Sequence, residues 1–359
     1  MNSKIIKKIM DYAKQQEIVD LTIVPKDGYH LLTGENGLSK HQLKLPAKLA
    51  GDLSLVYKQL LKIAPDDLVS STYLKDQDTT FKISIVPELN GEKIIINTIT
   101  KNRKLFSLSK LGLGREERKI VENFLKKNKG LIVIGADDNE GKTSTLYALL
   151  QKINKEVRAC YLLEKYNELE LPEISKITSS QEKRLLDLQR VLKSDSDVIA
   201  IDDADDDLLK EALVAAYSGR LALATCKTTS AANLVDKIQK ISRREDLPIL
   251  LIYQRMFKKN CPHCLKAYLA NESTELINNY WPSNKKYRPQ KFFSSLGCPK
   301  CQHSGNSGEI ASFNLIEINK QSVNIISSLA SDILQKAANG LISMSKFISE
   351  SKTEENKKL

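Results

Sequence analysis

The chain has 359 residues, of which 41% are hydrophobic and 28% charged, a composition typical of a folded protein with two or three domains. Its apolar runs are far shorter than the ~18 to 20 residues that cross a bilayer, and its lysine-interrupted N-terminus lacks a signal-peptide core. These features exclude a membrane-spanning protein and predict a cytoplasmic location. The net charge of +11 is spread along the chain, which favours a solvated surface over a nucleic-acid groove, so no nucleic-acid partner is expected.

The first 105 residues predict a small α+β domain. Helical spacing of apolar residues predicts helices over 1–16 and 52–63, and alternation predicts strands over 19–24 (stopping at Pro25), 80–86 and 93–99. The last two strands form a hairpin around the turn-rich segment 87–92. A linker is expected over 101–113 and a helix over 115–128.

An apolar run at 131–134 is followed by a polar loop that ends in Gly141-Lys142-Thr143, and then by a helix start at 145–150. A strand, a loop and a helix in this order are the setting of a phosphate-binding loop. Gly141 lets the backbone approach a phosphate, Lys142 can reach the β- and γ-phosphates, and the Thr143 hydroxyl can ligate Mg²⁺. The segment predicts a nucleotide site, to which we also assign Asn139, Glu140 and Ser144.

This loop departs from the usual G-x-x-x-x-G-K-[ST] pattern. Its first glycine position holds Ala136, and Asp137, Asp138 and Glu140 place three carboxylates where a polyanion must bind. At roughly 8 Å and an effective dielectric of 20 to 80, each carboxylate costs about 0.5 to 2 kcal/mol. Glycine is also scarce, at 15 of 359 residues against a usual ~7%. A helix start that binds no ligand stays open as the alternative.

Strands and helices alternate after the loop, which predicts a mainly parallel sheet with crossover helices. Strands are expected at 159–163, ending at Glu164, at 197–203, ending in Asp202-Asp203, and at 221–225, with a helix over 180–194. A carboxylate at a strand end can hold the water shell of Mg²⁺, and its neighbour can polarise an attacking water. We assign the first role to Asp202 and the second to Asp203.

Two Cys-x-x-Cys pairs, Cys261/Cys264 and Cys298/Cys301, are separated by 33 residues. Four thiolates in such pairs predict a tetrahedral Zn²⁺ site, which is structural because its coordination is closed. The separation exceeds the 15 to 20 residues usual in such sites, so an inserted element is expected. Redox-active or unliganded cysteines are the alternative.

Other side chains in this part of the sequence have simpler expected roles. Tyr280, Trp281 and Phe292 are available to pack the insert, and Cys160 and Cys226 are expected to be buried apolar residues. His263 and His303 are expected to be exposed rather than ligands. Helices are predicted over 322–336 and 341–349, before a charged tail at 350–359.

With the phosphate loop, the acidic strand end and the paired cysteines in this order, the chain resembles the secretion ATPases that drive type II secretion and type IV pilus assembly. The resemblance covers nearly the whole chain. It is carried by segments 19–25, 84–87, 91–93, 141–150, 197–199 and 254–255, and by Gly297 and Ser304-Gly305 around the cysteines.

The resemblance implies an α/β architecture of four parts. These are a PAS-like domain (1–105), a RecA-like P-loop NTPase core (106–256), a four-cysteine zinc module (257–318) and C-terminal helices with a tail (319–359). It further implies ATP and Mg²⁺ binding, a homo-hexamer or a mixed hexamer with a paralogue, and an inner-membrane platform protein as partner. The expected location is cytoplasmic, at the inner membrane. The extra N-terminal docking domain of many members is expected to be missing.

Several positions depart from the family pattern. Lys165 replaces the aspartate of the acidic box Glu164-Lys165-Tyr166-Asn167-Glu168, Asp203 stands at the glutamate position, Asp202 at a glycine, and Lys227 at the histidine of the His box. Family arginines that face the nucleotide align with Leu32, Gly34, Lys82 and Asn97. One such arginine can be worth roughly 10³ to 10⁵ in rate. Two hypotheses follow: a hydrolysing motor, in which Asp203 and Glu164 orient water, or a degenerate, non-hydrolysing scaffold or regulator.

Overall fold

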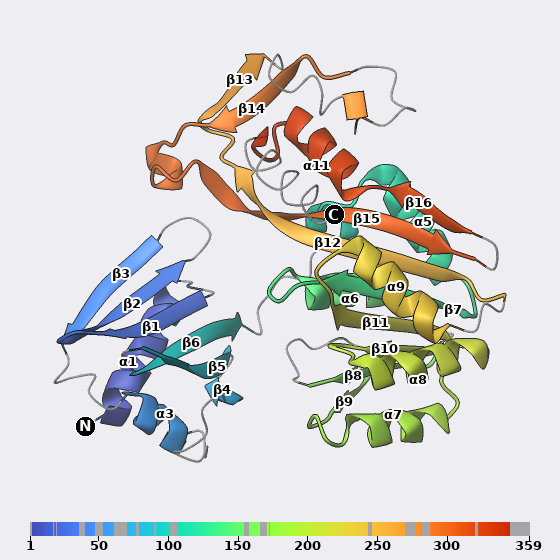
Figure 1. Ribbon diagram of the computed structural model, residues 1–359, viewed down its shortest axis with the longest axis horizontal. Coiled ribbons are helices and arrows are strands. Elements are labelled where there is room, and N and C mark those ends of the chain that lie inside the picture. Colours follow the sequence, from blue (N-terminus) through green and yellow to red (C-terminus); the bar gives the residue numbers. More distant parts are fainter. Residues whose placement is uncertain are drawn as a thin grey trace. The chain divides into compact units, whose positions relative to one another are not determined.

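The computed structural model describes residues 2–16, 18, 20–35, 40–46, 53–60, 70–76, 79–89, 91–100, 107–153, 158–165, 171, 173–242, 246–269, 278–279, 281, 288–319 and 322–344. The chain divides into two compact units (Figure 1). Unit 1 comprises residues 1–103 with 297–308, and unit 2 comprises 104–296 with 309–359. None of the described helices is both long and apolar enough to span a bilayer.

Unit 1 contains an antiparallel sheet of six strands within the described ranges. In spatial order they are β3 (Lys40–Pro46), β2 (Tyr29–Glu35), β1 (Asp20–Lys26), β6 (Gly91–Thr100), β5 (Thr79–Glu88) and β4 (Ser70–Asp76). Phe81, Ile83 and Ile85 alternate with half-buried residues along β5 and are fully buried. They join one core with α1 (Asn2–Gln15) and α3 (Leu53–Leu60), so these helices cover one face of the sheet.

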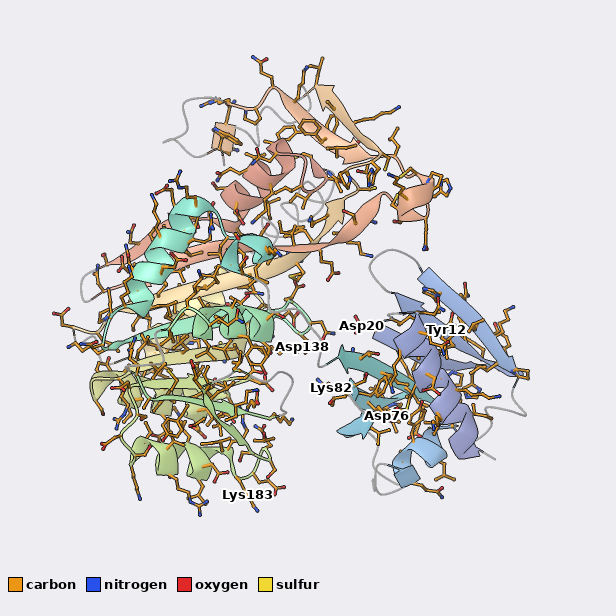
Figure 2. All side chains as sticks on the ribbon, turned by 180° about the vertical axis from the view of Figure 1, so that it is seen from behind. Tyr12, Asp20, Asp76, Lys82, Asp138 and Lys183 are labelled. Carbon is orange, nitrogen blue, oxygen red and sulfur yellow. The ribbon has the colours of Figure 1, made fainter. Side chains whose placement is uncertain are left out.

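Helix α1 is tied to both edges of this sheet. The Tyr12 hydroxyl lies 3.2 Å from Nδ1 of His41 on β3, and Lys14 forms an ion pair with Asp76 on β4. Tyr12 and Asp76 are labelled in Figure 2. Because the two contacts reach opposite edges, they fix the helix across the width of the sheet.

The two N-terminal helices and the hairpin of β5 and β6 are confirmed, with three differences. Strand β1 does not stop at Pro25, which pairs with His30, but continues to Lys26. The hairpin turn is shorter than 87–92, since Pro87 pairs with Glu92 in the ladder. Strands β2, β3 and β4 were not predicted. For β3 and β4 the reason is that they are edge strands with little apolar alternation.

Unit 2 contains a sheet of eight strands in the part of the chain that the structure describes. Their order is β16 (Val323–Ser327), β15 (Asn306–Ile318), β12 (Ile249–Asn260), β7 (Gly130–Ala136), β11 (Leu221–Lys227), β10 (Val198–Ile201), β8 (Cys160–Glu164) and β9 (Ser175–Thr178). Each pair from β12 to β9 is parallel, as predicted, and β15 pairs with β16 antiparallel.

Helices cover both faces of this sheet (Figure 1). On β7, Leu131 and Val133 face one core with α7 (Arg184–Leu192), α8 (Asp206–Tyr217), α9 (Ala231–Ile241) and α11 (Leu329–Ala338). Ile132 and Ile134 face the other core with α4 (Leu108–Leu111), α5 (Arg115–Leu125) and α6 (Lys142–Leu150). Burial on both faces explains the continuous apolar run of β7. Because the strands are parallel, the carboxyl ends of β7, β11, β10 and β8 lie at the same edge of the sheet.

Two predictions in unit 2 are wrong. The predicted helix over 322–336 begins as strand β16, whose Val-Asn-Ile-Ile sequence favours a strand, and α11 starts only after Ser328, whose hydroxyl accepts the Ser331 N–H. The predicted linker 101–113 contains helix α4, whose Leu108 and Leu111 are buried. Residues 341–343 are not helical, and 101–106, 345–349 and the tail 350–359 lie outside the described residues.

The element expected between the cysteine pairs is present. Strands β13 (Leu265–Leu269) and β14 (Lys291–Ser295) form an antiparallel pair. Phe292 is fully buried in the core below it, Trp281 packs against that core, and Tyr280 lies outside the described residues. The aromatic side chain of Phe292 thereby anchors the β13–β14 pair to the core.

Candidate functional site

The phosphate loop lies between β7 and α6. Its backbone takes left-handed conformations at Asn139 (φ 62°) and at Gly141 (φ 78°), which is the N-cap of α6. A Cβ atom on Gly141 would meet the Gln254 amide and the Met256 sulfur, each at 3.3 Å. Glycine is therefore required at 141 both for its φ angle and for the close approach of β12.

Lys142 lies over the loop. Its ammonium donates to the carbonyl oxygens of Ala136 (3.2 Å) and Asp137 (2.6 Å). Thr143 and Ser144 follow in the first turn of α6, half-buried, at a helix end whose N–H groups favour an anion. The lysine ammonium is thus held against the loop backbone, and the loop leads directly into the N-terminus of α6.

The three loop carboxylates are compensated or turned aside. Lys227, at the end of β11, forms ion pairs with Asp138 and with Asp137 (3.6 Å); Asp138 is labelled in Figure 2. The Asp138 amide, and then the Lys227 ammonium, hold the pKa of Asp137 below its usual value. Glu140 accepts the backbone N–H of Met256. Because Lys227 is more than half exposed, its ion pairs are individually weak, but they offset the repulsion expected between the loop and a phosphate.

Asp202, directly after β10, connects this strand to helix α6 and strand β11. Its carboxylate accepts from the Thr143 hydroxyl (3.1 and 3.0 Å to the two oxygens) and from the Thr225 hydroxyl (2.7 Å). Burial raises the pKa of Asp202, and the two hydroxyls oppose that shift. Hydroxyl and carboxylate oxygens are ligands that Mg²⁺ accepts, and the Thr143 hydroxyl and the Asp202 carboxylate already face one another.

Asp203 is exposed and has a left-handed backbone (φ 52°). Its N–H donates to the Thr225 hydroxyl (2.7 Å), and its carbonyl accepts from the buried Arg184 guanidinium (2.6 Å), which also bonds the carbonyl of Asp202. The turn after β10 is therefore held from both sides while the Asp203 carboxylate points into solvent.

Glu164 is fully buried at the end of β8. Its carboxylate accepts from the Tyr147 hydroxyl (2.6 Å) and pairs with the Lys176 ammonium (3.0 Å), which also lies over the Tyr147 ring. Burial raises the pKa of Glu164. Parallel pairing of β8 with β10 places it in register beside Asp202, whose N–H donates to the carbonyl of Leu163.

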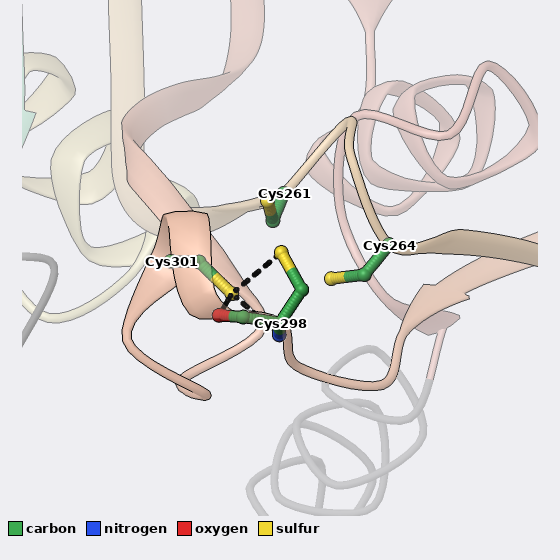
Figure 3. Close-up of side chains that lie close together, drawn as sticks. All are labelled: Cys261, Cys264, Cys298 and Cys301. Atoms are coloured by element: carbon green, nitrogen blue, oxygen red, sulfur yellow. Dashed lines mark hydrogen bonds between the residues drawn. The ribbon is translucent and has the colours of Figure 1, made fainter.

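The four cysteines of the two pairs converge (Figure 3). Their sulfur atoms lie within 4.8 Å of one another, and those of Cys298 and Cys301 are 3.7 Å apart. Tetrahedral Zn–S bonds of ~2.3 Å place sulfurs about 3.8 Å apart, so the donor set fits zinc. The Cys301 sulfur also accepts N–H groups from Cys298 and Gly305. His263 and His303 are exposed, and Cys160 and Cys226 are buried, as predicted.

The profile of the family described as "Type II/IV secretion system protein" matches residues 55–356. The chain belongs to this family. The type II secretion system ATPase E of Vibrio cholerae is 24% identical over 282 residues, which are 76% of this chain and 55% of that protein. The Escherichia coli protein transport protein HofB homolog is 26% identical over 339 residues, 88% of this chain and 70% of its own length.

Two solved structures share the fold of this secretion-family chain. The Legionella pneumophila ATPase DotB superposes with a TM-score of 0.63 at 14% identity, over 97% of this chain and 95% of that one. The pilus retraction motor PilT with bound ADP gives 0.52 at 16% identity, over 70% and 78%. The chain spans about half the length of the first curated relatives it matches.

Three residues that matter at the secretion-family site were missed from the sequence. Arg184, Thr225 and Gln254 position the strand ends and the loop, and all are buried. A signal existed for Gln254 and Thr225, because each is a polar residue directly after an apolar strand run. Nothing in the sequence around Arg184 separates it from the other cations of its predicted helix.

Proposed function

We propose that this chain is a Mg·ATP-hydrolysing motor of type II secretion or type IV pilus assembly. The observation that carries the proposal is the contact between the Thr143 hydroxyl and the Asp202 carboxylate, 3.0 Å apart, with Thr143 directly after the loop residue Lys142 in the chain. A loop lysine, a hydroxyl and a strand-end carboxylate in this arrangement are the parts that phosphoryl-transfer enzymes use to hold phosphates and Mg²⁺.

The proposed roles follow from these positions. Lys142 binds the β- and γ-phosphates, with backbone N–H groups from Asn139, Glu140, Gly141 and Ser144. Thr143 and Asp202 would hold Mg²⁺, which would neutralise phosphate charge when bound. Asp203 orients the attacking water with Glu164. Zn²⁺ would be held by the two Cys-x-x-Cys pairs, Cys261/Cys264 and Cys298/Cys301. It would cross-link the pairs without taking part in hydrolysis.

The assembly is part of the same proposal. We infer a hexamer, of this chain alone or mixed with a paralogue, at the cytoplasmic side of the inner membrane with a platform protein as partner. The names of the relatives support the kind of machine proposed, since they include a type II secretion system ATPase and a pilus retraction motor. The four-part division into a PAS-like domain (1–105), a RecA-like core (106–256), a zinc module (257–318) and C-terminal helices (319–359) is proposed with it.

One observation favours a second candidate, a non-hydrolysing scaffold or regulator. The Glu164 carboxylate has both oxygens occupied, one by Tyr147 and one by Lys176, and is fully buried. Water activation would then fall to Asp203 alone, whose side chain is one methylene shorter than the glutamate at that position in the family. A nucleotide-binding protein without turnover would result.

One experiment separates these candidates. Mg·ATP binding is measured by calorimetry and phosphate release at steady state on the same assembled sample, with Lys142→Ala as the background. Micromolar binding with turnover above that background supports the motor. Binding without turnover supports the scaffold. If wild-type protein and Lys142→Ala both fail to bind nucleotide while remaining folded, both candidates are wrong.

A further inference from the structure

Strand β12 lies beside β7 and passes along the phosphate loop. Ile252 and Tyr253 of β12 pair with Ile134 and Gly135, the two residues that precede Ala136 at the end of β7. The next residues of β12 no longer pair with β7 in this register, because the chain after β7 turns into the loop. Their polar groups bond to the loop instead.

Gln254 makes two of these bonds. Its amide nitrogen donates to the carbonyl of Glu140 (2.5 Å), and its amide oxygen accepts from the Thr145 hydroxyl (2.7 Å). Gln254 is 1% exposed and Thr145 is fully buried. A buried amide must be hydrogen-bonded to be tolerated, so this side chain spans the end of the loop and the first turn of α6 in one fixed orientation.

Glu140 completes the arrangement. Its carboxylate accepts the backbone N–H of Met256, two residues further along β12. Both the carbonyl and the side chain of Glu140 are thereby attached to β12, and the carboxylate reaches toward that strand. The residues on either side, Asn139 and Gly141, are the ones with left-handed backbone.

We propose that Glu140, Gln254 and the Met256 amide form a clamp that holds the phosphate loop in its nucleotide-ready conformation. A non-glycine residue in the left-handed region is strained and persists only where its surroundings over-determine it. The clamp fixes the backbone of Glu140, between Asn139 and Gly141. It thereby keeps Asn139 in its strained left-handed conformation. Glu140 is then a positioning residue for nucleotide binding; this rests on the proposed function, since ATP is the ligand.

The clamp and a simple electrostatic view give opposite predictions. If Glu140 acts only as a negative charge near phosphate, its removal strengthens ATP binding, by Coulomb's law. If Glu140 is part of a clamp, its removal weakens ATP binding, because ordering the loop then consumes part of the binding free energy. The sign of the change therefore decides between them.

The experiment measures Mg·ATP affinity by calorimetry for three variants. Glu140→Ala removes the acceptor and is expected to weaken binding about tenfold, the effect of one charge-assisted hydrogen bond. Glu140→Gln keeps an oxygen for the Met256 amide and is expected to stay within about threefold of wild type. Asp137→Asn is the matched control: it removes a loop carboxylate without touching β12, and is expected to bind ATP at least as tightly as wild type. Equal or tighter binding by Glu140→Ala would overturn the clamp.

A second measurement needs no nucleotide. Amide exchange over residues 137–146 is followed in the nucleotide-free full chain, and Glu140→Ala and Gln254→Leu are each expected to exchange about fivefold or more faster than wild type. Thermal unfolding of Gln254→Leu checks that the fold persists. Should wild-type protein bind no ATP, the proposed function fails while exchange still tests the clamp. Unchanged exchange in Glu140→Ala, which alters only a half-exposed loop side chain, would show that the loop is ordered without it.

Discussion

The hydroxyl of Thr143 donates to the carboxylate of Asp202 across 59 residues of sequence, from the first turn of α6 to the end of β10. Thr225, at the end of β11, donates to the same carboxylate. The parallel order β7, β11, β10 makes this possible, because it brings the carboxyl ends of all three strands to one edge. Mg²⁺ between Thr143 and Asp202 would take over a position that is already organised.

Thr143→Val is therefore expected to remove the magnesium dependence of ATP binding. It keeps the shape of the side chain and deletes the hydroxyl, so ATP affinity with Mg²⁺ should fall roughly tenfold or more, toward the value measured with a chelator. Thr143→Ser retains the hydroxyl and serves as the control. Equal magnesium dependence in Thr143→Val and wild type would contradict the assignment of Thr143.

Arg184 supports the Asp202–Asp203 turn from within the protein. Arg184 is 1% exposed, and its guanidinium donates to the carbonyls of both aspartates. Arg184→Leu leaves two buried acceptors without donors, and we expect it to lower the free energy of unfolding by about 2 to 4 kcal/mol. Urea unfolding measures this. Leu185→Ala, on the same helix but 37% exposed, should change stability far less; similar losses in both would mean that α7 as a whole, rather than the Arg184 bonds, carries the effect.

The sequence revealed the parts of the site that follow from local patterns. Leu131–Ile134 and Gly141-Lys142-Thr143 specify a strand, a glycine-dependent turn and a helix within twenty residues, and the four cysteines are recognisable from spacing alone. The ion pair of Lys227 with Asp138 was hidden, because it depends on β11 lying next to β7. The same holds for Glu164, whose burial against Tyr147 and Lys176 follows from the sheet order and not from its own neighbours.

The wrong prediction over 322–336 has a similar origin. Val323–Ser327 carries β-branched residues at neighbouring positions, and Val323 and Ile325 are largely exposed. Apolar residues at three- and four-residue spacing across β16 and α11 mimic one helix. Pairing with β15 selects the strand, a long-range effect that periodicity cannot report.

Thiol chemistry gives a prediction for the four-cysteine cluster. Cys160 and Cys226 are 3% and 0% exposed, and burial raises the pKa of Cys226 to about 11, so both should be inert to a thiol reagent at neutral pH. The zinc-loaded protein is expected to react slowly at all six cysteines. Chelation should release one zinc and make the four cluster thiols reactive, with the other two reacting only after unfolding.

The control for this titration is the double variant Cys160→Ser with Cys226→Ser, which should show the same four reactive thiols after chelation. Loss of zinc should also lower the thermal stability of the chain, since metal binding contributes folding free energy. Four reactive thiols before any chelation, together with no zinc released, would refute the metal assignment and favour unliganded cysteines.

Asp332 and Lys336 form an ion pair inside unit 2, on α11. They are 8% and 5% exposed, and Asp332 also accepts the backbone N–H of Phe313 on β15 (2.8 Å), so the pair fastens the helix to the sheet. Burial raises the pKa of Asp332 and lowers the pKa of Lys336, while each partner opposes the shift of the other. A buried pair of this kind is stable only while both charges are present.

Lys336→Met is expected to destabilise the protein in a pH-dependent way. Without the ammonium, the pKa of Asp332 rises further. Between the unfolded pKa of ~3.9 and that raised value the folded state binds more protons than the unfolded state, so the free energy of unfolding falls as pH increases. The loss relative to wild type should be small near pH 4 and reach about 3 to 5 kcal/mol near pH 7.5, measured by urea unfolding. Combining Lys336→Met with Asp332→Asn removes both charges and keeps an acceptor for the Phe313 N–H, so the double variant should lose most of this pH dependence and regain most of the stability lost near pH 7.5. A loss of equal size at both pH values would show that Lys336 stabilises α11 by packing on Phe313, 5.4 Å from its ammonium, and not by its charge.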